Sequence, residues 1–155
     1  MKIRRAELKD IPKIGDLLLQ VCHVHHCGRP DLFMDGRRKY ASDELAEILS
    51  DESRPVFVAV DGDDAVLGYA FCAFEKHGGN VSPEFTGLYV DDICVDETMR
   101  GRRIGSALYG AVKEFAVQKG CYNITLHVWE CNPGARKFYE SLGMKTQFTS
   151  MEEIL

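Results

Sequence analysis

Apolar residues recur along the chain with two periods, and these periods predict its helices and strands. Helical spacing predicts helices over residues 11–26 and 104–119, a second helix that begins at Ser42 with Leu45, Ile48 and Leu49 facing inward, and a short helix that starts at Pro133 and ends near Leu142. Asp10, Ser42 and Asn132 stand where helix N-caps are expected. Strand-like alternation or buried apolar runs predict strands over residues 3–5, 56–60, 65–74, 86–95, 124–128 and 145–151.

The predicted elements follow the order β-α-α-β-β-β-α-β-α-β. Asp61 to Asp64 form a hairpin turn in this scheme, and residues 78–83 form a loop. We expect an α/β fold of the α+β type, with a central mixed sheet flanked by helices on both faces. No linker or internal repeat interrupts the pattern, so residues 1–155 are predicted to form a single domain.

Composition and charge narrow the function classes. The chain has 155 residues, of which 45% are hydrophobic, and a net charge of −5. A nucleic-acid partner is not expected because the basic footprint is missing. The acidic balance favours a cationic substrate weakly, and ordinary solubility is the preferred interpretation of the charge. No apolar run of membrane-spanning length and no signal pattern occurs, and the six cysteines form no CxxC pair, so we expect a reduced, cytoplasmic protein without membrane contact.

The segment from Arg100 to Ser106 is the strongest candidate for a ligand site. It joins a predicted strand to a predicted helix through a turn that contains Gly101. The first N–H groups of a helix have no partner within it and can bind phosphate, and three arginines add positive charge. The turn lacks the P-loop and dinucleotide glycine patterns. An arginine-rich surface turn without a ligand is the alternative interpretation.

Two motifs resemble the GNAT superfamily of acyl-CoA-dependent N-acetyltransferases. The first is Arg100-x-x-x-x-Gly105, preceded by Tyr89-Val90-Asp91-Asp92-Ile93-Cys94-Val95, and it is similar to the family's pyrophosphate turn. The second is the segment from Asn132 to Met144, which contains Phe138-Tyr139 and Leu142-Gly143. Arg103 stands where the family pattern usually has its middle glycine. We expect it to be tolerated there with a negative φ.

The resemblance implies acetyl-CoA as the acyl donor and an amine as the acceptor. It places the donor on residues Ile93, Cys94, Val95, Arg100, Gly101, Arg102, Arg103, Ile104, Gly105, Ser106, Asn132 and Phe138. The first three would pair with the pantetheine arm where two strands part, and the backbone N–H groups of residues 102–106 would hold the pyrophosphate. No metal is implied, and a homodimer is expected by family analogy alone.

Direct acetyl transfer needs a base for the amine and an acid for the leaving thiolate. Tyr139 is the candidate acid by resemblance, with aromatic packing beside Phe138 as the alternative. Asp91 and Asp92 resemble the acidic pair of polyamine acetyltransferases, and strand alternation would send them to opposite faces, with Asp92 favoured for the site. His127 is the alternative base, at a position where ribosomal-protein acetyltransferases carry a glutamate, and Glu130 is a weaker one.

The sequence leaves open the identity of the acceptor and the role of one histidine and cysteine cluster. The acidic pair suggests a small polyamine or amino compound, whereas the ribosomal likeness allows a protein or peptide amine. Cys22, His23, His26 and Cys27 lie at i, i+4 spacing, which would suit a metal, but a lid over the acceptor site is the preferred interpretation. A non-catalytic acyl-CoA sensor remains the alternative function.

Overall fold

A computed structural model describes all 155 residues of the chain. Its helices are α1 (Ile11–Gly28), α2 (Ser42–Ser50), α3 (Ile104–Gln118) and α4 (Pro133–Ser141), with short 3-10 turns η1 (Leu8–Asp10) and η2 (Glu97–Met99). Its strands are β1 (Lys2–Arg5), β2 (Val56–Val60), β3 (Val66–Gly79), β4 (Ser82–Val95) and β5 (Ile124–Leu126). The chain folds into one five-stranded sheet in the order β1-β2-β3-β4-β5.

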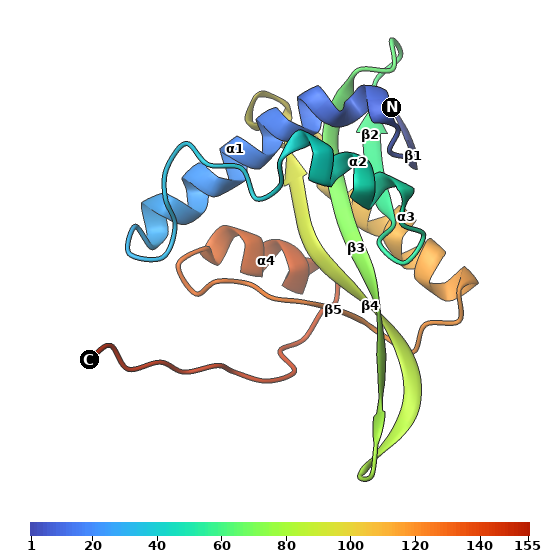
Figure 1. The fold of residues 1–155 in the computed structure, drawn as a ribbon, viewed down its shortest axis with the longest axis vertical. Coiled ribbons are helices and arrows are strands. Elements are labelled where there is room, and N and C mark those ends of the chain that lie inside the picture. The colour runs from blue at the N-terminus through green and yellow to red at the C-terminus, as the bar shows by residue number, and fades with distance from the viewer.

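The sheet is mixed, as the sequence predicts. The first four strands run antiparallel to their neighbours, whereas β5 pairs with β4 in parallel. A parallel partner needs a crossover connection, and α3 supplies it. Helices α1 and α2 cover one face of the sheet and α3 covers the other (Figure 1).

Each face of the sheet has its own apolar core. On the first face, Leu17 and Leu18 of α1 and Leu45 of α2 pack with Val58 of β2 and Tyr69 of β3. On the second, apolar residues one helical turn apart on α3 pack on strands β2 to β4; these are Ile104, Leu108, Val112 and Ala116. Both stripes are the ones that the hydrophobic pattern predicts.

The structure corrects the lengths of three strands and the cap of one helix. Strand β5 ends at Leu126 rather than at residue 128. Strands β3 and β4 are longer than predicted and meet in a tight turn after Gly79, because His77 stacks on Phe85 and holds the extension together. Ala41, rather than Ser42, is the N-cap of α2, since the Glu44 carboxylate accepts from its backbone N–H at 2.7 Å.

The predicted strand over residues 145–151 is absent. This segment has no strand and makes no ladder with β5; it lines a cavity together with residues 123–131 instead. Its apolar side chains stay in solvent: Phe148 is 64% exposed and Met151 is 92% exposed. Because these side chains bury little apolar surface, the segment has no buried face that would hold it in register with β5. None of the helices is both long enough and apolar enough to span a bilayer.

Candidate active site

The turn before α3 has the geometry of an anion site, with one unexpected residue. Gly101 has φ 78°, and Arg103, the N-cap of α3, has φ 61° and ψ 17°. The expectation of a negative φ at Arg103 is therefore wrong: the residue adopts the left-handed conformation that glycine reaches without steric cost. Gly101 and Arg103 thus both have left-handed backbone at the turn that leads into α3, and both line a cavity.

Strands β4 and β5 separate next to this turn. Their pairing runs from Leu88↔Ile124 to Val90↔Leu126 and stops there. Beyond it, β4 continues to Val95 without a strand on that side, so the backbone groups of its last residues have an unpaired edge. An extended arm bearing amide groups, such as pantetheine, can bind along such an edge.

Helix α4 brings the second motif against the turn. The Asn132 side chain caps the helix by accepting from the backbone N–H of Ala135 at 3.1 Å, as the sequence predicts. Phe138 packs against Gly105, where an added Cβ would lie 3.1 Å from the Phe138 ring. Gly105 therefore lets α3 and α4 approach closely, and this approach fixes the position of the neighbouring Tyr139.

A single cavity of about 1230 Å³ joins these features. Nearly all of the predicted site residues line it: Asp91, Asp92, Ile93, Cys94, Val95, Arg100, Gly101, Arg103, Ile104, Gly105, Ser106, His127, Asn132, Phe138 and Tyr139. Arg102 alone among them is not part of the lining. On the opposite side of the cavity lies the segment between α1 and α2, with Phe33, Arg37, Arg38 and Lys39.

A β-bulge changes how the two aspartates point. Phe71 of β3 is opposite Asp92, and Cys72 is opposite Val90, so Asp91 is an extra residue without a partner. The expectation of opposite faces is wrong for this reason. The Tyr40 hydroxyl donates to Asp91 at 2.9 Å, and the Tyr69 hydroxyl donates to Asp92 at 2.6 Å. Both carboxylates are thus directed towards the face that α1 and α2 cover.

The two carboxylates have different electrostatic surroundings. The Lys39 ammonium lies 2.7 Å from both oxygens of Asp91 and neutralises its charge. Asp92 has no cation in direct contact. Burial raises the pKa of Asp92 to about 6, against the lowering effect of the Tyr69 hydrogen bond. A carboxylate with this pKa is ionised at neutral pH and is a stronger base than an exposed one, as a general base requires.

Tyr139 is a protonated phenol in the same cavity. Burial, followed by the negative charge of Asp92, raises the pKa of Tyr139 well above its usual value. Its ring contacts those of Phe138 and Tyr109, which hold it in place. The phenol therefore keeps its proton at neutral pH and can donate it to a basic leaving group such as a thiolate.

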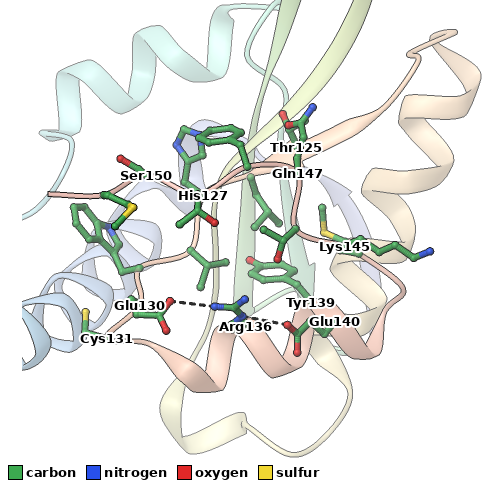
Figure 2. Close-up of a pocket in the computed structure, with 18 of the residues that line it drawn as sticks. Thr125, His127, Glu130, Cys131, Arg136, Tyr139, Glu140, Lys145, Gln147 and Ser150 are labelled. Carbon is green, nitrogen blue, oxygen red and sulfur yellow. Dashed lines mark hydrogen bonds and ion pairs between the residues drawn. The ribbon is translucent and has the colours of Figure 1, made fainter.

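His127 lies between this cavity and a second one of about 940 Å³. The second cavity separates residues 123–131 from the terminal segment, and Tyr139 lines it as well (Figure 2). The Tyr89 hydroxyl lies 3.3 Å from Nδ1 of His127. Glu130 is turned away to pair with Arg136 at 3.0 Å, so it has no contact with the acidic pair (Figure 2).

The histidine and cysteine cluster at the end of α1 supports the segment over the cavity. Nδ1 of His26 lies 2.7 Å from the backbone oxygen of Phe33, and the Phe33 ring packs between those of His25 and Trp129. No group of three or more His, Cys, Asp or Glu side chains is arranged to hold a metal ion. These contacts hold the segment after α1 against Trp129 at the cavity, and the lid role stays a prediction.

Sequence reasoning missed the partners of the aspartates. Lys39, Tyr40 and Tyr69 are far from residues 91–92 in sequence, and no local pattern links them. Arg37 was missed too. It lines the cavity without an acidic partner, whereas the neighbouring Arg38 lies 3.4 Å from Asp16. The run of three cations from Arg37 to Lys39 is the sequence signal that could have pointed to partners for the two carboxylates.

Comparisons with known proteins place this chain beside acetyltransferases. The model of the acetyltransferase (GNAT) family matches residues 20–144. Thialysine N-epsilon-acetyltransferase of Bos taurus is 31% identical over 88% of this chain and 72% of its own. A probable glucosamine 6-phosphate N-acetyltransferase of Drosophila melanogaster is 26% identical over 92% of this chain, which spans only 60% of that protein. A tetramutant of the BH1408 protein from Bacillus halodurans matches over the full length of both chains with a TM-score of 0.95 and 29% identity.

Proposed function

The chain belongs to the GNAT family of acetyltransferases, and we propose that it transfers an acetyl group from acetyl-CoA to the primary amine of a small acceptor. One observation carries the proposal: the turn before α3, the carboxylate of Asp92 and the phenol of Tyr139 all line the same cavity. Donor and acceptor can therefore meet side by side, and no covalent intermediate on the protein is needed.

The donor is assigned to the turn side of the cavity. The N–H groups at the start of α3 bind the pyrophosphate, aided by the charge of Arg100 and Arg103. The unpaired edge of β4 from Ile93 to Val95 binds the pantetheine arm. This arrangement directs the thioester towards Tyr139, because α4, which carries Tyr139, packs on Gly105 at the start of α3.

The reaction follows from the two side chains that face the thioester. Asp92 takes a proton from the acceptor ammonium, directly or through a water molecule. The free amine attacks the thioester carbonyl, the carbon–sulfur bond breaks, and Tyr139 gives its proton to the departing thiolate. His127 is the alternative base, and Asp91 acts by holding Lys39 and Tyr40 rather than by moving a proton.

We propose that the acceptor carries an anionic group as well as its amine. Lys39 already neutralises Asp91, and Arg37 lines the cavity without an acidic partner. The cavity therefore has one guanidinium without an acidic partner and one carboxylate without a cation in direct contact, which suits a zwitterion better than a polyamine. The acceptors named for the two relatives, thialysine and glucosamine 6-phosphate, both combine an amine with an acidic group.

The test is the release of CoA thiol from acetyl-CoA in the presence of defined amines. The panel contains lysine, thialysine and glucosamine 6-phosphate, with spermidine, an aminoglycoside and a short peptide for comparison. We expect turnover with at least one zwitterionic amine and much less with spermidine. Turnover with the polyamine alone would refute the acceptor class. Acetyl-CoA binding without transfer to any amine would favour the sensor function instead.

A further inference from the structure

The cavity of the proposed enzyme already contains a primary amine of the chain itself. Lys39 belongs to the segment between α1 and α2, which has no helix or strand of its own at this point. Its ammonium lies 2.7 Å from both oxygens of Asp91, and both residues line the cavity that contains Asp92, Tyr139 and the anion-binding turn. Lys39 thus places an ammonium in this cavity, on Asp91, the residue that directly precedes the proposed base.

Electrostatic evidence places the Lys39 charge near the proposed base. After burial and the Tyr69 hydrogen bond, the positive charge of Lys39 is the next influence on the pKa of Asp92. The Lys39 side chain is 47% exposed, so it is not locked by packing and can turn from one carboxylate towards the other. An amine tethered next to a base and a thioester reacts at a high effective concentration.

We propose that Lys39 is a self-acetylation site, modified within one chain when acetyl-CoA is bound and no acceptor is present. The inference rests on the proposed function. Asp92 accepts a proton from the Lys39 ammonium, the amine attacks the thioester carbonyl, and the carbon–sulfur bond breaks. The products are an Nε-acetyl amide on Lys39 and CoA thiol, which receives its proton from Tyr139.

Acetylation of Lys39 changes the charge of the acceptor side. The amide is neutral, so Asp91 loses its cation and keeps only the hydrogen bond from Tyr40. The acetylated chain then has two negative carboxylates at the acceptor side of the cavity. We expect it to bind cationic acceptors more tightly than the unmodified chain and anionic acceptors more weakly.

The experiment is peptide mapping by mass spectrometry after incubation with acetyl-CoA and no amine. We expect one acetyl group on Lys39, formed at a rate that does not change on dilution of the protein. Lys39→Arg removes the label, whereas Lys113→Arg, at an exposed position on α3, leaves it unchanged. Asp92→Asn slows the labelling about 10²-fold, the usual contribution of a general base.

Four results overturn the proposal. Equal labelling of Lys39 and Lys113, insensitive to Asp92→Asn, would show chemical acetylation in solution. A rate that rises with protein concentration would show transfer between chains. Absence of label on Lys39 in a protein that acetylates a small amine would refute self-acetylation and leave the proposed function standing. Absence of both activities, with acetyl-CoA still bound, would refute the two together.

Discussion

The hydroxyl of Tyr69 on β3 donates a hydrogen bond of 2.6 Å to the carboxylate of Asp92 on β4. Tyr69 is fully buried, and its ring packs edge-on against Phe71. This hydrogen bond favours the ionised form of Asp92, whereas burial favours the protonated form, and burial is the larger effect. The balance places the pKa of the proposed base at about 6.

Removal of the Tyr69 hydroxyl is expected to shift the pH dependence of acetyl transfer. In the unmodified protein, kcat/KM should rise with pH through about 6 as Asp92 loses its proton. In Tyr69→Phe the carboxylate loses its hydrogen bond, so its pKa rises and the acidic limb moves to higher pH. Steady-state rates from pH 5 to 9 measure this. An unmoved limb would show that a group other than Asp92 is the base.

Asp92→Asn should make the protein more stable at alkaline pH. The pKa of Asp92 is raised from 3.8 to about 6 in the folded state, so this state binds more protons than the unfolded one between these values. Stability therefore falls as pH rises across this window and stays low above it. At pH 8 we expect the Asn variant to gain up to about 3 kcal/mol of unfolding free energy in urea.

Asp91→Asn is the matched control for this measurement. The Asp91 carboxylate is paired with Lys39 and accepts from Tyr40, so its removal should lower stability at the same pH. If both variants changed stability in the same direction, the structural distinction between the two aspartates would be wrong.

The left-handed backbone at Arg103 predicts a stability difference between two substitutions. Glycine adopts φ 61° without steric cost, whereas alanine keeps the strain of a Cβ atom. We expect Arg103→Gly to be about 1 kcal/mol more stable than Arg103→Ala by chemical denaturation, even after the entropy cost of glycine. Both variants lose the same charge, so equal stabilities would mean that the turn is not strained.

Arg37 is expected to decide between acceptor classes. Arg37→Gln should raise KM for a zwitterionic acceptor about 10-fold, because a charge-assisted hydrogen bond contributes roughly 1.5–3 kcal/mol. KM for spermidine should stay constant or fall. Lys113→Gln removes a charge from exposed α3 and serves as the control. A KM for the zwitterion that Arg37→Gln leaves unchanged would remove Arg37 from the acceptor site.

Much of the fold and part of the site follow from sequence because the signals are local. Apolar periodicity predicts the α1 and α3 faces, and Asn132 caps α4 as its type and position suggest. The bulge at Asp91 could not be predicted, since it arises from the register between β3 and β4. The Lys39–Asp91 pair joins residues 52 positions apart and depends on how the segment after α1 folds back.

In the terminal segment, the sequence pattern predicts a strand that the structure does not contain. Residues 145–151 alternate as a strand would, yet their apolar side chains find no surface to bury. Alternation with a period of two describes which residues are apolar. A strand also needs the edge of a neighbouring strand with which to pair. The same limit applies to Arg103, whose φ is dictated by the turn geometry rather than by its own preference.

The most direct test of the account is a comparison of Tyr139→Phe with the unmodified protein in acetyl transfer and in acetyl-CoA binding. The acetyl-CoA affinity should stay within about twofold, because the phenol acts only on the leaving thiolate. The turnover rate should fall about 10²-fold or more, the contribution expected of a general acid. Unchanged turnover in Tyr139→Phe, with binding also unchanged, would contradict the assignment of this cavity as an acetyltransferase site in which Tyr139 is the acid.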